Sequence, residues 1–333
     1  MQEQEKYSKT LNLEGEKWLF IGGAGFVGSN VVHEFRNFGA SCFVMDNLVT
    51  GRHERIAKVA TLLKADSRDE DVIHETLNRF EITGVVHLAA FMQARESVLD
   101  PEKYWSNNLG AVIGLAKSLK GTKVRQVILS SSCSVYGDVD NATEKANLNP
   151  QSAYAATKVA SEQILFQICK ELNINAIALR YFNVIGAGGF EYGCDLSSGT
   201  ILPSTLRRIL RGEKPRIYGA NFNTRDGTCI RDYIDVRDLA SAHRKVAMSD
   251  RLEGNVTINI STGVPRSVYE IVSELLCNVT SELEIEYLDP MIGDPATVSA
   301  YPSKHLEELG WKSEISFEKS VKDFYESFKK YNS

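Results

Sequence analysis

The stretch WLFIGGAGFVGSN, residues 18–30, indicates the fold most directly, because an apolar strand runs directly into a glycine-rich turn and then into an apolar helix. Its glycines have the spacing G-x-x-G-x-x-G, in which Gly22 and Gly25 allow a tight turn and close backbone approach to a pyrophosphate, while Gly28 lets the helix pack on the sheet. The helix N-terminus offers its amides to the anion. The residues that we expect to contact a dinucleotide here are Gly22, Gly25, Phe26, Val27 and Gly28.

Downstream of this turn, short apolar runs alternate with amphipathic stretches, and no internal repeat or low-complexity segment interrupts them. Strands that alternate with helices of this length indicate βαβ units and a parallel sheet. The predicted strands are Trp18–Ile21, Cys42–Met45, Thr61–Leu63, Val85–Leu88, Val127–Leu129 and Ala176–Leu179. The predicted helices are Phe26–Phe38, Asp69–Phe80, Pro101–Leu119 and Tyr154–Leu172.

The regular alternation of strands and helices ends after Asn183, where a glycine-rich polar loop and shorter elements follow. We therefore predict an α/β protein with a Rossmann-type doubly wound parallel sheet and a smaller C-terminal α/β lobe for substrate. The expected division is a polar N-terminal tail over residues 1–16, an NAD-binding domain over 17–183, and a mainly substrate-binding lobe over 184–333. Parts near residues 230–262 are expected to return to the first domain.

Composition excludes several classes of function. The net charge of −5 gives no electrostatic reason to bind nucleic acid or an anionic membrane. The six cysteines lack CxxC spacing, which argues against a disulfide framework or a metal site and fits a reducing cytoplasm. The first residues are polar and acidic, unlike a secretory signal, and no apolar run approaches the ~20 residues that span a bilayer.

A carboxylate that ends the second predicted strand points to the cofactor. Asp46 is placed to accept from the ribose hydroxyls of adenosine and to repel a 2′-phosphate, so NAD is favoured over NADP. The alternative for Asp46 and Asn47 is a turn or cap. Asp66 and Ser67, after the third predicted strand, are expected to flank the adenine, although an aspartate that opens a helix is also a common cap.

Tyr154 and Lys158 lie four residues apart in a predicted helix, which places both side chains on one face. A fixed ammonium favours the phenolate, which at neutral pH needs a pKa shift of roughly 3 units. The hydroxyl of Ser132, placed opposite, can share the proton. Such a trio suits the removal of a proton from a sugar alcohol while its hydride leaves. On its own, the Y-x-x-x-K pattern is equally compatible with an ordinary surface helix.

With these motifs in sequence, the chain resembles the extended short-chain dehydrogenases/reductases, and within them the UDP-glucose (UDP-galactose) 4-epimerases. The matching segments are GGAGFVGSN, MDNL, HLAA, ESVLDPEKYWSNNLG, SSSCSVYG, NPQSAYAATK, LRYFNVIGA, DGTCIRDYIDVRDLASAH and LEELGW. They span residues 18–311, nearly the whole chain. DGTCIRDYIDV and the ESV…NN block are specific to the epimerase branch.

The resemblance implies roles for individual side chains: Tyr154 is the base, Lys158 holds the nicotinamide ribose, and Ser132 bonds the reacting hydroxyl. Arg231 clamps the diphosphate and Tyr218 lies against the uracil. The other residues implied at the cofactor are Leu88, Ala89, Ala90, Asn107, Ser130 and Tyr181. Those implied at a UDP-sugar substrate are Ser132, Asn183, Thr200, Ile201, Tyr218, Arg231, Asp294 and Val298. The alternative, purely structural roles are an ordinary strand aromatic for Tyr218, a surface ion pair for Arg231 and a helix cap for Asn107.

The implied reaction is 4-epimerisation of a UDP-hexose through a transient 4-keto sugar, with NAD regenerated in each cycle and therefore retained. Related sugar-nucleotide dehydratases carry an Asp-Glu pair where this chain has Cys133 and Ser134, and uronate decarboxylases usually carry glutamate at the second position. Neither residue here supplies a carboxylic acid. A uronate 4-epimerase or another nucleotide-sugar oxidoreductase stays open, and a non-catalytic NAD-binding regulator is the alternative from another class.

Four positions bear on the substrate. Ile21 replaces the family's usual threonine, Met92 stands where many hexose epimerases have lysine, and Met291 occupies the position of a second diphosphate arginine. Val298 falls on the residue whose bulk gates N-acetyl sugars, and its intermediate size predicts that UDP-GlcNAc and UDP-GalNAc are accepted. The candidates for replacing the missing cation are Arg95, Arg207 and Arg208.

Family members commonly form homodimers through helices that correspond to residues 101–119 and 154–172. The apolar residues that would allow this are Ile113, Leu115, Ile164 and Phe166, which burial inside the monomer explains equally well.

Overall fold

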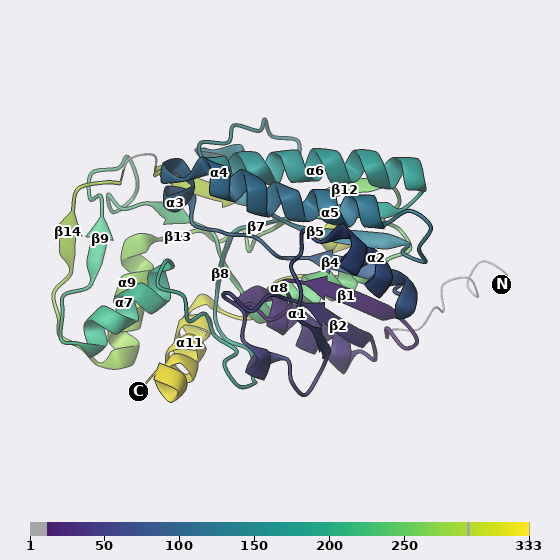
Figure 1. Ribbon diagram of the computed structural model, residues 1–333. Helices are drawn as coiled ribbons and strands as arrows, with labels where there is room; N and C mark the ends of the chain where they lie inside the picture. The colour runs from purple at the N-terminus through teal and green to yellow at the C-terminus, as the bar shows by residue number, and fades with distance from the viewer. Residues whose placement is uncertain (1–11, 292–293, 333) are drawn as a thin grey trace, which may run out of the picture.

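Seven parallel strands form the central sheet of the computed structural model, which describes residues 12–291 and 294–332 (Figure 1). They are β1 (Lys17–Ile21), β2 (Ser41–Met45), β3 (Thr61–Leu63), β4 (Gly84–His87), β5 (Gln126–Ser132), β7 (Asn175–Tyr181) and β12 (Asn255–Ile260). Across the sheet their order is β12-β7-β5-β4-β1-β2-β3. The order reverses between β1 and β4, which is where open α/β sheets bind their ligands. All six predicted strands are confirmed.

Helices cover both faces of this sheet. They are α1 (Phe26–Asn37), α2 (Glu70–Arg79), α5 (Gly110–Ser118), α6 (Ala153–Leu172) and α8 (Val236–Ala247). The helices α1 and α8 pack together on one face of the sheet, and α2, α5 and α6 pack together on the other (Figure 1). Alternate residues of β1 serve the two faces: Phe20 packs in the core beneath α1, and Leu19 and Ile21 in the core beneath α2 and α5. Burial on both faces explains why the strands read as continuous apolar runs.

The helix predicted over residues 101–119 is confirmed over residues 101–118, but it contains a π-helical turn and a separate short helix precedes it. The chain forms α3 (Ala94–Leu99), α4 (Pro101–Tyr104), a π-helical turn η3 (Trp105–Leu109) and then α5. Side-chain periodicity does not reveal one extra residue in a turn, so the sequence reads as a single helix. Such turns occur frequently at functional sites.

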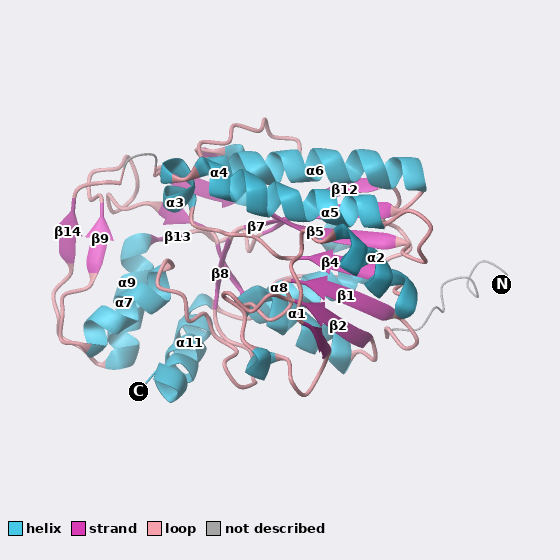
Figure 2. Cartoon of the chain, viewed as in Figure 1, coloured by secondary structure: helices cyan, strands magenta, loops and turns pink. Residues whose placement is uncertain are grey.

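A second group of elements lies to the left of the sheet in Figures 1 and 2. Its helices are α7 (Ile201–Leu210), α9 (Val268–Val279) and α11 (Phe317–Asn332), and its outer strands are β9 (Arg216–Tyr218) and β14 (Glu286–Leu288). Leu206, Ile271 and Phe324 are fully or almost fully buried among these helices. This separate apolar core explains why the regular alternation of strands and helices ends after residue 183.

Short strands and helices connect the two cores. The pair β11-β8 and the four-stranded sheet β13-β10-β15-β6 run between them. The remaining elements are η2 (His53–Arg55), η4 (Cys133–Tyr136), β6 (Val139–Ala142), β8 (Asn183–Ile185), β10 (Ile230–Arg231), β11 (Tyr233–Asp235), β13 (Arg266–Ser267), β15 (Thr297–Ala300) and α10 (Lys304–Glu308).

Two side chains from the N-terminal part of the chain hold the loop that enters the second core. The buried guanidinium of Arg55 donates to the carbonyls of Tyr192 and Cys194, each at 2.9 Å. Asn30, on α1, donates to the carbonyl of Gly193 at 3.1 Å. These hydrogen bonds hold the loop at residues 192–194 against α1 and η2.

The expected tail over residues 1–16 is only partly described, since residues 1–11 lie outside the described residues. Leu13 is 3% exposed and packs in the core beneath α1, and its amide donates to the carbonyl of Phe38 at 2.6 Å. Residues from at least Leu13 onward therefore belong to the folded body, because a single apolar residue in a polar stretch anchors it.

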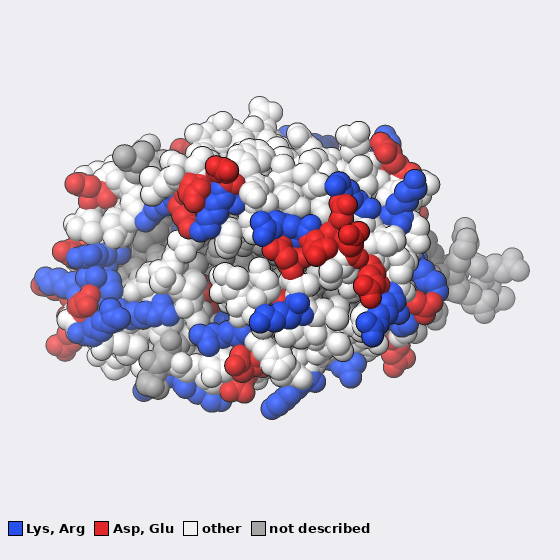
Figure 3. Space-filling view, viewed as in Figure 1, with Lys and Arg blue, Asp and Glu red and all other residues white. Residues whose placement is uncertain are grey.

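Acidic and basic side chains are interspersed on the face shown in Figure 3, without a large area of one sign. Within residues 12–291 and 294–332, none of the helices combines the length and apolar character that crossing a bilayer requires. The same residues contain no cluster of three or more His, Cys, Asp and Glu that could hold a metal ion.

Candidate active site

The glycine-rich turn joins the end of β1 to α1 at the reversal point of the sheet. Gly22 has φ +82°, and a Cβ there would lie 2.5 Å from the amide nitrogen of Ala89. The amides of Leu88 and Ala89 donate to the carbonyl of Ile21 at 2.8 and 3.0 Å. The structure thus brings Leu88 and Ala89 against the turn, and Gly22 has no room for a side chain.

The N-terminus of α1 is built to receive an anion. A Cβ at Gly25 would meet only the carbonyl of Gly22 at 3.5 Å, so space is open above it. No side chain caps α1, and its first turn carries no acidic residue. The first helical amides, from Phe26 onward, have no partners within the helix. These features fit the pyrophosphate of a dinucleotide.

Asp46, at the end of β2, binds the turn from the other side. Its Oδ2 accepts from the amide of Ala24 at 3.0 Å and its Oδ1 from the amide of Leu48 at 2.8 Å. The side chain is mostly buried, and a Cβ at Gly51 would clash with both carboxylate oxygens. Each oxygen keeps lone-pair capacity for a further donor. Asn47 caps its own loop by accepting from Val49.

The structure does not bring Asp66 into direct contact with this turn. A bidentate hydrogen bond from Arg68 holds the pKa of Asp66 below its ordinary value. Asp69, rather than Asp66, caps α2, since its side chain accepts from the amide of Val72 at 3.2 Å. Ser67 lies between them in the loop after β3.

Ser132, Tyr154 and Lys158 converge at the carboxyl end of β5. Ser152 caps α6 by accepting from the amide of Ala155, and this starts the helix one residue before Tyr154. The Lys158 Nζ lies 5.8 Å from the centre of the Tyr154 ring and donates to the carbonyl of Ser130 at 2.7 Å. The trio that the sequence suggests is therefore one cluster in space.

Burial dominates the electrostatics of this cluster. It raises the pKa of Tyr154 to about 12, against the opposing effect of a hydrogen bond with Ser132. Burial also lowers the pKa of Lys158 to about 8, although the charge of Glu162 opposes this. In the protein by itself, burial therefore opposes formation of the phenolate.

Two polar side chains hold Tyr154 in place, and the sequence analysis assigned no role to either of them. The Oγ of Ser97, on α3, accepts from the amide of Tyr154 at 3.0 Å. Asn108, in the π-helical turn, donates to Thr157, whose hydroxyl donates to the Tyr154 carbonyl at 2.7 Å. Both residues stand in the quoted ESV…NN block. Asn107, the residue predicted at the nicotinamide, donates to Asn108 at 3.0 Å.

Tyr181 is also part of a buried network. Its hydroxyl lies 2.6 Å from the Nε2 of His243, on α8. The Nδ1 of His243 is 2.9 Å from the carbonyl of Leu239, which can only accept, so Nε2 is the acceptor for Tyr181. Ser130 also makes a hydrogen bond with Tyr181. The predicted cofactor residues Ser130 and Tyr181 therefore support Lys158.

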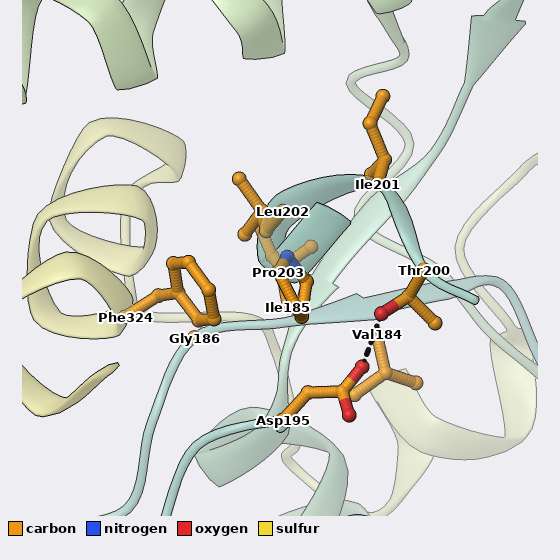
Figure 4. Close-up of a pocket in the computed structure, with 9 residues that line it drawn as sticks. All are labelled: Val184, Ile185, Gly186, Asp195, Thr200, Ile201, Leu202, Pro203 and Phe324. Carbon is orange, nitrogen blue, oxygen red and sulfur yellow. Dashed lines mark hydrogen bonds between the residues drawn. The ribbon is translucent and has the colours of Figure 1, made fainter. Parts of the chain in front are cut away.

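Three of the residues predicted at the substrate come from β8 and the start of α7. Asn183 begins β8, Thr200 is the N-cap of α7 and Ile201 its first residue. The hydroxyl of Thr200 donates to Asp195, as Figure 4 shows, in a pocket that Val184 and Leu202 also line. Thr200 is thus held by the loop that follows β8.

The residues predicted at the nucleotide end are Arg231, on β10, and Tyr218, on β9. The Arg231 guanidinium, on β10, donates to the carbonyls of Ile230 at 2.7 Å and Pro295 at 2.9 Å. Tyr218 ends β9 and is 37% exposed. Arg231 also lies close enough to the Cys133 thiol to oppose the rise that burial causes in its pKa.

Val298 pairs with Arg231 between β15 and β10, but its side chain is only 5% exposed. It packs in an apolar cluster with Val135 and Phe182. Met92, by contrast, is 58% exposed in the loop before α3.

Known proteins resemble this chain over nearly its whole length. The model of the "NAD dependent epimerase/dehydratase family" matches residues 18–261. A UDP-glucose 4-epimerase of Streptomyces lividans is 35% identical over 302 residues, which cover 89% of this chain and 91% of the relative.

Two solved structures extend the likeness to the fold. A UDP-glucose 4-epimerase from Bifidobacterium longum, in complex with NAD+ and UDP, superposes with a TM-score of 0.86 at 27% identity, covering 95% of this chain and 98% of that one. A UDP-N-acetylglucosamine 4-epimerase from Methanobrevibacter ruminantium gives 0.84 at 30% identity, covering 95% and 99%. The chain therefore belongs to the NAD-dependent epimerase/dehydratase family, in the branch of extended short-chain dehydrogenases/reductases that contains the UDP-glucose 4-epimerases.

Proposed function

We infer that the protein is an NAD-dependent 4-epimerase that interconverts UDP-glucose and UDP-galactose. The observation that carries this inference is the cluster of Tyr154 with the buried side chains of Ser132 and Lys158, beside an uncapped, glycine-rich helix N-terminus. It combines a general base for a hydroxyl proton with a cradle for a dinucleotide.

Each member of the cluster has one task in this reaction. The Tyr154 oxygen takes the proton of the C4 hydroxyl and later returns it, while Ser132, which bonds to Tyr154, holds that hydroxyl in line. The ammonium of Lys158 uses one N–H on the carbonyl of Ser130, which leaves two for the ribose of the cofactor. NAD, when bound, supplies the position that takes the hydride from C4 and gives it back to the opposite face of the 4-keto sugar.

The substrate residues are divided between the two ends of the UDP-sugar. Arg231 and Tyr218 hold the nucleotide, and the planar guanidinium of Arg231 suits a diphosphate. Asn183 contacts the sugar diphosphate, and Thr200 is a further substrate residue. A nucleotide held firmly and a hexose held loosely allow the keto sugar to turn over without leaving the site.

The test is to incubate the purified protein, without added cofactor, separately with UDP-galactose, UDP-GalNAc and UDP-galacturonate, and to identify the products by NMR. We expect UDP-glucose from UDP-galactose, with no net change in absorbance at 340 nm. Turnover of UDP-GalNAc would support the prediction drawn from the modest size of Val298. Turnover of UDP-galacturonate alone would favour a uronate 4-epimerase, and no turnover with NAD bound would refute epimerisation.

Replacing Asp46 with asparagine is expected to reduce the preference for NAD over NADP about tenfold or more. The variant keeps one oxygen to accept from an amide of the turn, but it loses the charge that repels a 2′-phosphate. Dissociation constants of both cofactors, measured on cofactor-stripped protein, check this. Asp69→Asn, at the exposed cap of α2, is the matched control. An unchanged ratio would mean that Asp46 only supports the turn.

We also propose that the protein is a cytoplasmic homodimer. All six cysteines are free, which supports a reducing compartment. Ile113 and Ile164 are half-buried on α5 and α6 and available to a partner, whereas Leu115 is fully buried in the monomer core. Sedimentation analysis at micromolar concentration tests the dimer.

A further inference from the structure

Arg95 stands at the open side of the candidate substrate site. It lies in the first turn of α3, and its side chain is 61% exposed. Its guanidinium carbon is 5.7 Å from the centre of the Tyr218 ring, and one terminal nitrogen is 3.5 Å from the Oδ2 of Asp294. That distance is at the limit of a hydrogen bond, and an ion pair this exposed contributes little. Arg95 is therefore free to bind another anion.

The position of α3 places Arg95 between the two ends of the site. Ser97, two residues on, accepts from the amide of Tyr154 at the reacting end. The guanidinium of Arg95 reaches Tyr218 at the nucleoside end. In a UDP-sugar the diphosphate lies between the uridine and the hexose, so it has to pass this position.

Arg231 approaches the same place from the other side. Its guanidinium donates to the carbonyl of Pro295, the residue that follows Asp294. Arg95 and Arg231 therefore meet one short segment of chain, although they come from α3 and β10. Two guanidinium groups on opposite sides of a diphosphate neutralise its charge and bond its oxygens bidentately.

The other two arginines that the sequence offers contact other parts of the chain. Arg207 donates to the carbonyls of Leu196 at 2.7 Å and Ser197 at 2.9 Å. Arg208 pairs with Glu213 at 3.0 Å and donates to a neighbouring carbonyl. Their guanidinium groups stabilise the loop before α7 and the end of that helix.

We propose that Arg95 binds the diphosphate of the nucleotide sugar opposite Arg231 and supplies the charge that Met291 does not. The proposal rests on the proposed function, because it takes the substrate to be a UDP-sugar. On binding, Arg95 leaves Asp294 and Tyr218, which frees the ring of Tyr218 for the uracil.

The test compares Arg95→Gln with the unmodified protein, both with their bound cofactor, by calorimetric titration with UDP and with uridine. We expect the dissociation constant for UDP to rise about ten- to hundredfold, the range for a lost charge-assisted hydrogen bond, and that for uridine to stay within about twofold. In the epimerase assay, KM should rise by a similar factor with little change in kcat. Arg95→Lys should recover part of the affinity.

Arg211→Gln is the matched control, since it removes an exposed arginine near the end of α7 and should leave both constants unchanged. Equal losses for UDP and uridine would overturn the proposal, because Arg95 would then act on the nucleoside. An unchanged UDP constant would overturn it as well. Failure of the unmodified protein to bind UDP would instead refute the proposed function.

Discussion

Replacing Tyr154 with phenylalanine is expected to lower kcat for the interconversion of UDP-galactose and UDP-glucose by about 10³-fold or more, since general base catalysis contributes up to about 10⁴-fold. The phenol is the group of the cluster that takes the hydroxyl proton in the proposed reaction. Removing one oxygen leaves the ring, the helix cap and the backbone bond to Ser97 in place. Steady-state kinetics, with UDP affinity and cofactor content measured on the same sample, check this result.

The control for Tyr154→Phe is Tyr301→Phe, because Tyr301 is 58% exposed in the loop after β15. This control should keep full activity. If Tyr154→Phe retained a tenth or more of kcat, another group would have to be the base. A loss of UDP binding together with activity would show that Tyr154 holds the substrate rather than its proton.

Replacing Gly22 with alanine is expected to abolish retention of NAD through purification and to lower the free energy of unfolding by about 2–4 kcal/mol. The new Cβ would lie 2.5 Å from the amide nitrogen and 2.7 Å from the Cα of Ala89, so the backbone has to move. The positive φ adds strain of about 1–2 kcal/mol. The ratio of absorbance at 260 and 280 nm reports bound cofactor, and denaturant titration of the cofactor-free protein reports stability.

Gly212→Ala separates the effect of backbone strain at a positive φ from the effect of the contact with Ala89. Gly212 also has a positive φ, +72°, but a Cβ there would meet nothing within 4 Å. We expect this variant to lose about 1–2 kcal/mol from backbone strain and to keep its NAD. Equal behaviour of the two variants would mean that the contact with Ala89 is unimportant for the cofactor.

The parts of the fold that follow from the sequence are those whose physical cause is local. The strand at Trp18–Ile21 and the turn after it are readable, because burial on both faces demands an apolar run and close packing demands glycine. The π-helical turn at Trp105–Leu109 is not, because it depends on how Asn108 bonds the loop after β4. Tertiary contacts, rather than periodicity, decide such a turn.

The same distinction holds for the site. The spacing of Tyr154 and Lys158 predicts that both side chains lie on one face of a helix. The sequence cannot show that Lys158 donates a hydrogen bond to the carbonyl of Ser130. Nor can it show that burial raises the pKa of the phenol, because burial is a property of the assembled lobes. Arg95 is the clearest case, since Asp294, its partner, lies far along the chain.

Helix α11 has a consequence for the order in which the molecule is assembled during translation. The glycine-rich turn and its partners are complete once the ribosome has made the first five strands of the central sheet. The second core also needs Val321, Phe324 and Phe328, which α11 contributes. A nascent chain therefore contains the residues of the cofactor turn long before it can close the second core.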